Sequence, residues 1–340
     1  MSNDSLLLKT ENLYKWFPKR GGILDRTVEH LKAVDGVSID VQRGETFGLV
    51  GESGCGKTTL GRTIMRLTDS SKGSITFDGA DITKLRGRQI KPFRRKMQMV
   101  FQDPYASLDP RQNVRSALLE PMRLHGLASS KREANTLAEE VMEKVGLNPD
   151  HLARFPHEFS GGQRQRIAIA LALVVQPSFI VLDEPTSSLD VSVQSQILKL
   201  LRKLQTDLGL TYIFISHNLA VIRQMCNRAA VMYLGRVVEL SPIETLFENP
   251  KHPYTRALLS SIPQPDPSKR KELRVLQGDV PSPIDIPPAC RFRPRCSFAT
   301  EKCGTIFPPL VEVEKDHWIE CHYDINFTKN SQLEISRPST

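Results

Sequence analysis

The chain has 340 residues, of which 39% are hydrophobic and 25% are charged. This length allows two or three domains with a sizeable core, which excludes a peptide or a disulfide-only mini-fold. The longest apolar runs, at 167–175 and 179–182, fall far short of the roughly 20 residues that span a bilayer. Lys plus Arg number 46 and Asp plus Glu 38, and the resulting charge of +8 suits phosphate-bearing partners without choosing among nucleotides, nucleic acids and anionic membranes.

Apolar patterns and turn residues predict the elements in chain order. Strands are expected at 6–17, 31–41, 46–50, 74–78, 96–101, 179–182 and 211–216. Helices are expected from about Lys57, at 116–124, at 131–145, from about Gly161 and at 191–207. The middle of the chain is therefore a helical insertion, and the alternation that follows it favours a mainly parallel sheet covered on both faces.

The two ends of the chain differ in amino-acid composition from this middle part. The N-terminus, MSNDSLLLKTENLYK, is acidic and polar where a secretory signal needs a basic region and an apolar core, so we expect a cytoplasmic protein. Prolines become dense between residues 250 and 309, which predicts a mostly irregular tail that relies on something other than a large apolar core. The tail also contains four of the six cysteines, namely Cys290, Cys296, Cys303 and Cys321.

A glycine-rich stretch directly after the strand expected at 46–50 has the pattern of a P-loop. Residues 51–58 read GESGCGKT, which fits GxxxxGK[ST] between a strand and a helix. In such a loop backbone N–H groups surround the phosphate oxygens, Lys57 reaches the β- and γ-phosphates, and the Thr58 hydroxyl ligates Mg²⁺. We therefore expect these residues to bind ATP: Gly51, Ser53, Gly54, Cys55, Gly56, Lys57, Thr58 and Thr59.

Two acidic residues follow the apolar strand expected at 179–182. Asp183 is expected to hold Mg²⁺ through water, and Glu184 to polarise the attacking water as a general base. That role requires a carboxylate that lies beyond the metal ligand and faces the γ-phosphate. The alternative is that the two acids only end a strand before Pro185.

The string FSGGQ at 159–163, followed by RQR, resembles the LSGGQ signature of ABC-type ATPases, with Phe159 in place of leucine. Other strings of this family surround it in order, and the resemblance covers about 6–250. Gln102 in MVFQDP resembles the Q-loop residue, Ser188, Leu189 and Asp190 resemble the D-loop, and His217 after YIFIS resembles the switch histidine. The resemblance implies an α/β fold of the ABC-type P-loop NTPases, with a RecA-like core, an antiparallel β subdomain and a helical signature subdomain at about 104–172, all within an ATPase domain at 1–250.

The resemblance also implies roles for these residues. Ser160, Gly161, Gly162 and Gln163 would contact ATP held by the P-loop of a facing subunit, so that each ATP lies between two chains. His217 would contact the γ-phosphate, and Gln102 would contact Mg²⁺ and link the site to a membrane partner. The catalytic residues would be Lys57, Glu184 and His217. In this family an aromatic side chain stacks on adenine, and the spacing points to Phe17; packing in the core or at a sheet edge is the alternative.

The tail resembles the C-terminal region of oligopeptide and dipeptide importer ATPases in KHPYTRALLSSIPQPDP, in GDVPSPIDIPPACRFRPRC, and in Cys303 and Cys321. We therefore expect a small, irregular, cysteine-containing region at 251–340. Four thiolates spaced C-x5-C-x6-C-x17-C can hold Zn²⁺ or a [4Fe–4S] cluster, and the resemblance favours the cluster. An empty site and disulfides are the alternatives, and a reducing cytoplasm disfavours disulfides.

The function implied is that of the ATP-hydrolysing subunit of a peptide importer, peripheral at the cytoplasmic face of the inner membrane. MVFQDPYASLDPR is closer to the F-type than to the D-type ATPase of such importers. The implied partners are a D-type second ATPase, two transmembrane permeases and, indirectly, an extracytoplasmic peptide-binding protein. An importer of nickel, glutathione or antimicrobial peptides is one alternative. An ABC ATPase that acts on nucleic acid or ribosomes is another, but the chain lacks a second cassette and a long coiled-coil insertion, so no nucleic acid partner is expected.

Overall fold

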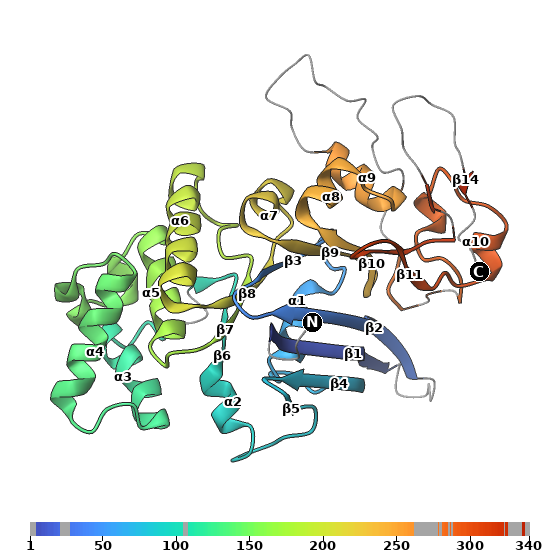
Figure 1. The fold of residues 1–340 in the computed structure, drawn as a ribbon. Coiled ribbons are helices and arrows are strands. Elements are labelled where there is room, and N and C mark those ends of the chain that lie inside the picture. Colours follow the sequence, from blue (N-terminus) through green and yellow to red (C-terminus); the bar gives the residue numbers. More distant parts are fainter. Residues whose placement is uncertain are drawn as a thin grey trace. The chain divides into compact units, whose positions relative to one another are not determined.

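The computed structural model describes residues 5–20, 28–104, 108–261, 278, 281–284, 286, 288–322, 324–325 and 335–336 of the chain. The chain divides into two compact units (Figure 1). The first, here called the helical unit, comprises Met1–Leu8, Val41–Thr46 and Phe77–Ile215. The second, here called the P-loop unit, comprises Lys9–Asp40, Phe47–Thr76 and Ser216–Thr340.

Three parallel strands form the sheet of the helical unit, in the order β8-β7-β6. Every residue of β7 and β8 is buried, as their continuous apolar sequences require of strands covered on both faces. The strands are β6 (Met97–Val100), β7 (Phe179–Asp183) and β8 (Thr211–Ile215), and the short strand β5 (Ala80–Asp81) belongs to the same unit.

Helices α3, α4 and α5 of this unit pack on one another beside β6 and β7 (Figure 1). Local signals set their ends. The side chain of Asn113 accepts the Ser116 N–H at the start of α3, and Gly126, with a φ of 62°, ends that helix in the left-handed conformation. The helices are α2 (Lys91–Lys96), α3 (Val114–His125), α4 (Lys131–Lys144), α5 (Gly161–Leu173) and α6 (Val191–Leu208), with 3₁₀ turns at Pro149–Ala153 and Pro156–Glu158.

The P-loop unit contains a sheet of order β11-β12-β10-β9-β3, in which β3 and β9 are parallel and the other pairs are antiparallel. The strands are β3 (Thr46–Val50), β9 (Arg228–Tyr233), β10 (Arg236–Pro242), β11 (Leu310–Glu314) and β12 (His317–Glu320). A second group of neighbouring strands has the order β2-β1-β4, with β1 (Leu6–Arg20), β2 (Val28–Gln42) and β4 (Lys72–Phe77). Strands β13 (Asp324–Ile325) and β14 (Ile335–Ser336) pair antiparallel.

The helices of the P-loop unit are shorter than α3, α4, α5 and α6 of the helical unit. They are α1 (Lys57–Ile64), α7 (Leu219–Met225), α8 (Ile243–Glu248), α9 (Pro253–Ser260) and α10 (Lys302–Thr305), with a 3₁₀ turn at Arg293–Arg295. Among the helices that the structure describes in either unit, none is both long and apolar enough to cross a membrane.

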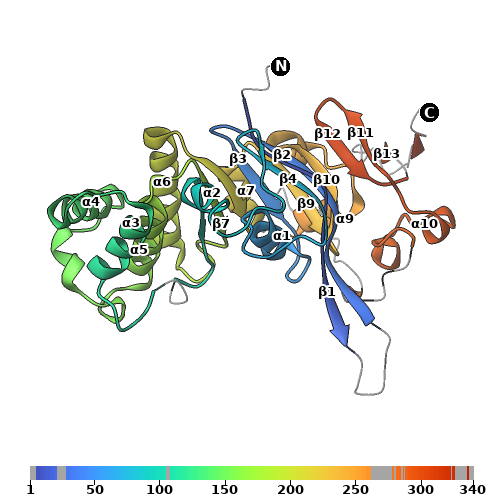
Figure 2. The same ribbon diagram turned by 90° about the horizontal axis from the view of Figure 1, so that it is seen from below.

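The strands and helices expected between residues 46 and 216 are present, with ends that differ by a few residues. The expectation that the tail is mostly irregular is wrong for residues 310–320, where β11 and β12 form a hairpin that extends the sheet beyond β10 (Figure 2). An apolar pattern does not predict these strands, because polar side chains, including His317 and Glu320, occupy buried positions in β12. The sheet is also less parallel than expected, since β10, β11 and β12 pair antiparallel.

A buried carboxylate joins three parts of the P-loop unit. Glu239 on β10 is fully buried and accepts the backbone N–H groups of Lys251 at 2.7 Å and His252 at 3.0 Å, just before α9. His317 on β12, also fully buried, places Nε2 at 2.7 Å from Glu239 Oε1. A buried charge is tolerated where hydrogen bonds surround it in this way, so Glu239 fixes α9 and β12 against β10.

Replacing this carboxylate should destabilise the P-loop unit. Glu239→Ala leaves two buried N–H groups and one imidazole without their partner. The free energy of unfolding is expected to fall by about 3 kcal/mol or more. Urea denaturation followed by fluorescence would show a lower midpoint. Glu244→Ala on α8 is the control: Glu244 forms an exposed pair with Arg223 at 3.6 Å, and loss of this pair should lower the free energy of unfolding by less than about 1 kcal/mol. Equal midpoints for the two variants would contradict the role of Glu239.

Candidate nucleotide-binding site

The P-loop turns between the end of β3 at Val50 and the start of α1 at Lys57. Gly51 and Gly56 have φ angles of 150° and 108°, in the range that favours glycine. A Cβ at Gly51 would lie 2.3 Å from the Met232 carbonyl oxygen, and one at Gly56 would lie 2.0 Å from that of Ala33. Side chains are therefore excluded at both positions, which lets the loop pack against the backbones of β9 and β2.

Lys57 lies inside this loop. Its side chain is 5% exposed, and Nζ donates to the carbonyl oxygens of Gly51 at 2.8 Å and Glu52 at 2.9 Å. Other expected phosphate ligands lie nearer the surface: Ser53 and Gly54 are exposed, and Gly56, Thr58 and Thr59 are half-buried. The loop thus combines one internal cation with the N-terminal N–H groups of an eight-residue helix, which is the electrostatic arrangement that attracts phosphate.

Cys55, which directly precedes Gly56 in the loop, is buried, with 2% of its surface exposed. Burial raises the pKa of the Cys55 thiol, and nearby Lys57 opposes this shift. A raised pKa keeps the group a protonated thiol, which is a weak nucleophile. The Cys55 side chain therefore acts here as a small buried group.

His217 follows the last strand of the helical unit and belongs to the P-loop unit. The N–H of the preceding residue, Ser216, donates to the Leu49 carbonyl oxygen of β3 at 3.2 Å. Asn218 caps α7 by accepting the Ala220 N–H at 3.0 Å. His217 is exposed between these two fixed residues, so its backbone is held beside the strand that leads into the P-loop.

Three further expected residues belong to the helical unit. Asp183 is the last residue of β7 and is 2% exposed. Glu184 has a φ of 47°, which is uncommon for a residue other than glycine, and its N–H donates to the Ile215 carbonyl oxygen at 3.0 Å. Gln102 Nε2 donates to Glu184 Oε2 at 3.1 Å, which brings together the expected Q-loop residue and the expected general base. Strained conformations of this kind cluster at functional sites.

The signature string starts α5. Ser160 is the N-cap: its hydroxyl accepts the Gln163 N–H at 3.3 Å, and the Gln163 side chain accepts the Ser160 N–H at 3.0 Å. This reciprocal pair is a capping box. Ser160 and Gly161 are exposed, so the helix presents its first turn to the surface of the helical unit.

The D-loop lies against this first turn. A Cβ at Gly162 would lie 2.4 Å from Cγ1 of Val193, so glycine is what lets α6 approach α5 this closely. A Cβ at Gly161 would lie 3.5 Å from Cδ2 of Leu189, an ordinary contact. Asp190 caps α6 by accepting the Val193 N–H at 3.0 Å, and a hydrogen bond from Ser192 lowers the pKa of Asp190. Ser188 is exposed beside these residues.

The aromatic residues at the end of β1 differ in their surroundings. Trp16 Nε1 donates to Asp35 Oδ1 at 2.8 Å, and the ring packs edge-on against Tyr14. Phe17 is 39% exposed, and Lys15 Nζ lies 4.8 Å from the centre of its ring. Trp16 is therefore fixed by packing, while Phe17 is the more exposed of the two rings. Contact of Phe17 with adenine stays a prediction.

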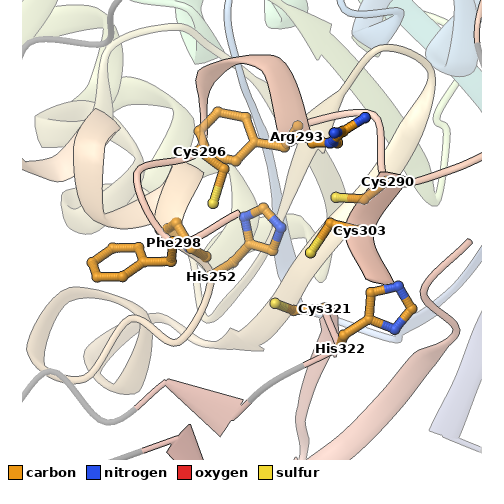
Figure 3. Close-up of a pocket in the computed structure, with 10 residues that line it drawn as sticks. His252, Cys290, Arg293, Cys296, Phe298, Cys303, Cys321 and His322 are labelled. Atoms are coloured by element: carbon orange, nitrogen blue, oxygen red, sulfur yellow. The ribbon is translucent and has the colours of Figure 1, made fainter. Parts of the chain in front are cut away.

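All four cysteines of the tail line one pocket (Figure 3). The Cys290 N–H donates to the Cys303 carbonyl oxygen at 3.1 Å, which holds the two segments together. Burial raises the pKa of Cys290, and it raises that of Cys296 to about 11. The six cysteines are free thiols, so the disulfide alternative is not seen. The other lining residues are His252, Pro253, Phe292, Arg293, Phe298 and His322.

The structure does not itself place a metal in this pocket. In the described part of the chain, no three His, Cys, Asp or Glu side chains are arranged to hold a metal ion. The structure does show that the four expected ligands, which lie between residues 290 and 321, line the same pocket. The zinc ion or iron–sulfur cluster expected there stays a prediction.

Residues of the tail that no sequence pattern marks as functional contact the P-loop. Arg295 donates to both carboxylate oxygens of Glu52, and the Tyr254 hydroxyl accepts the Glu52 N–H at 2.9 Å. Tyr254 lies in the HPY string, so that string could have marked it as important, but no local pattern indicates a partner about 200 positions away.

Two family models match the chain, the first over residues 34–187 and described as ABC transporter. The second matches residues 238–303 and is described as the oligopeptide/dipeptide transporter C-terminal region. A putative oligopeptide transport ATP-binding protein of Bacillus subtilis (strain 168), YkfD, is 51% identical over 86% of this chain and 89% of its own length. The oligopeptide transport ATP-binding protein AppF of the same strain is 47% identical over 94% of this chain and 98% of its own length.

Solved structures share the fold over most of the chain. One is a dimeric ATP-binding cassette in a post-hydrolysis state bound to ADP and Pi: its TM-score is 0.62 at 28% identity, over 70% of this chain and 99% of that one. Another is CbiO1 from Clostridium perfringens, part of an ABC transporter complex, with a TM-score of 0.61 at 30% identity over 72% of this chain and 91% of that one. These similarities agree with the strand, P-loop and helix order described above.

Proposed function

Because the chain belongs to the family of ABC transporter ATP-binding proteins, we propose that it is the ATP-hydrolysing subunit of a peptide importer. The observation that carries the proposal is the presence, in one chain, of an ABC cassette and of a tail that matches the oligopeptide/dipeptide transporter C-terminal region. The relatives named as oligopeptide transport proteins match both parts at about half identity, which supports peptides as the cargo.

In this proposal the P-loop residues 51–59 bind the phosphates of ATP, and Phe17 stacks on the adenine. Thr58, Asp183 and Gln102 would hold Mg²⁺, and their hydroxyl, carboxylate and amide oxygens are the hard donors that this ion prefers. Glu184 takes the proton of the attacking water. His217 contacts the γ-phosphate and stabilises the charge that develops there.

The signature turn provides the support for a dimer. Residues 160–163 present a capped helix N-terminus at the surface, where it can contact ATP bound by a second cassette. Leu189 lies against that turn, and Ser188, Leu189 and Asp190 would meet the same partner. We assign the chain as the F-type subunit of a pair with a D-type ATPase, bound to two permeases at the cytoplasmic face of the membrane and served by an extracytoplasmic peptide-binding protein.

The cysteine-lined pocket is proposed to hold a [4Fe–4S] cluster, with Zn²⁺ as the alternative. The support for this proposal is that Cys290, Cys296, Cys303 and Cys321 line one pocket, and that cysteine sulfur is the usual ligand of iron–sulfur clusters. When bound, the cluster would supply ligation energy to a segment with few buried apolar residues. The role proposed for it is structural.

Replacing the general base should separate binding from hydrolysis. We expect Glu184→Gln to bind ATP and to form a lasting dimer, while its turnover falls by a factor of about 100 or more, because the amide cannot accept the proton of water. Phosphate release and size-exclusion chromatography with ATP measure the two effects. Glu139→Gln, an exposed change on α4, is the matched control. Near-normal turnover of Glu184→Gln would remove Glu184 as the base.

The importer assignment itself predicts a set of partners. A tagged chain extracted from native membranes in gentle detergent should carry two polytopic permeases and a second ABC ATPase. Vesicles reconstituted with that complex and its binding protein should take up di- or oligopeptides when ATP is supplied, and not with the Glu184→Gln variant. Nickel or glutathione uptake would change the cargo, and recovery of ribosomal or nucleic-acid partners without permeases would overturn the importer.

The cluster predicts a metal content. Protein purified without oxygen should contain iron and acid-labile sulfide in equal amounts, and Cys303→Ser should lose both. Cys226→Ser is the control, because Cys226 is buried outside the pocket. Zinc without sulfide would favour the alternative ion. Purified protein with neither metal, from cells with a full iron supply, would contradict the proposal.

A further inference from the structure

The second residue of the P-loop, Glu52, is bound by the tail. Arg295 Nη1 donates to Glu52 Oε2 at 2.7 Å, and Nη2 donates to Oε1 at 3.0 Å. The Arg295 side chain is 4% exposed and that of Glu52 is 26% exposed, so the pair is largely shielded from water. Paired, nearly parallel bonds of this kind fix direction as well as distance.

The backbone of Glu52 is held from the same side. The Tyr254 hydroxyl accepts its N–H, and Tyr254 is fully buried on α9. The Tyr254 ring packs against those of Tyr233, at 4.8 Å between centres, and Phe292, at 5.5 Å. The Arg295 guanidinium also lies 5.9 Å from the centre of the Tyr233 ring. The aromatic rings of Tyr233, Tyr254 and Phe292 therefore surround the two groups that bind Glu52, namely the Tyr254 hydroxyl and the Arg295 guanidinium.

A carboxylate in this position acts against phosphate binding. The P-loop attracts an anion through its N–H groups, Lys57 and the start of α1. An unpaired negative charge on Glu52, within the same loop, would oppose that attraction. Glu52 also touches the catalytic lysine directly, because its carbonyl oxygen accepts from Lys57 Nζ at 2.9 Å. Pairing Glu52 with a cation, and fixing its position, should therefore strengthen the binding of the ATP phosphates.

We propose that Arg295 is a positioning residue for ATP binding, which pairs with Glu52 so that the P-loop keeps its shape and its attraction for phosphate. The inference rests on the proposed ATP-binding function. Arg291, in the same segment, supports the loop indirectly. Its guanidinium donates to the Leu234 carbonyl oxygen, and the N–H of Gly235, which follows Leu234, donates to the Cys55 carbonyl oxygen at 2.8 Å. The segment 290–296, which bears both arginines, therefore braces the loop at two places.

The test is whether loss of Arg295 can be corrected by removing the charge it neutralises. Titration of the purified subunit with a fluorescent ATP analogue and Mg²⁺ gives the dissociation constant, and ATPase assays give KM and kcat. Arg295→Met should raise the dissociation constant on the order of tenfold. The double variant Arg295→Met with Glu52→Gln should recover most of that loss, whereas a purely structural role for Arg295 predicts no recovery. The increase should appear in KM more than in kcat.

Matched variants keep the result interpretable. Arg223→Met and Glu244→Gln remove an exposed Arg–Glu pair of the same unit and should leave ATP affinity unchanged. Arg295→Lys keeps the charge but loses the paired geometry, so it should fall between wild type and Arg295→Met and serves if the latter does not fold. Unchanged affinity in Arg295→Met, or a double variant no better than the single one, would overturn the inference. A wild-type chain that does not bind ATP would instead overturn the proposed function.

Discussion

A loop that holds phosphates with its backbone must turn so tightly that side chains are excluded from it, and the P-loop unit is organised around this constraint. Gly51 and Gly56 press against carbonyl oxygens of β9 and β2, at distances that no Cβ could share. The turn after β9 holds the loop by hydrogen bonds: the Gly235 N–H donates to the Cys55 carbonyl oxygen, and the Gly235 carbonyl oxygen accepts the Asp35 N–H. The loop is thus shaped by strands that lie both before and after it in sequence.

Charged groups of the tail contact this platform, in addition to the aromatic cluster around Tyr233. Arg291 pairs with Asp35, and Arg236 pairs with Glu320 at 2.6 Å. Burial raises the pKa of Glu320 to about 7, although Arg236 opposes the shift. Pairs of this kind contribute little net stability because desolvation offsets their attraction, but a wrong arrangement leaves a buried charge alone. We infer that these pairs specify how the tail docks more than how strongly it does so.

Local rules explain what the sequence could predict. The P-loop glycines, the apolar strands at 46–50 and 179–182 and the Ser160 cap are each recognisable within a few residues, and each is present in the structure. The β11–β12 hairpin was not predicted, because β12 buries His317 and Glu320, whose partners lie 78 and 84 positions earlier. The pair of Arg295 and Glu52 spans 243 positions. Such pairings depend on the completed fold, so a single sequence carries no periodic signal for them.

The bracing of the P-loop by the tail also bears on how chains of this family can recombine. The two family models match separate stretches, which suggests two exchangeable modules. Yet an exchange that brought in a tail without an arginine at position 295 would leave Glu52 beside the phosphates without its counter-charge. A chimera joined between the cassette and the tail is therefore expected to work only if both ends of the Glu52–Arg295 pair come from compatible parents.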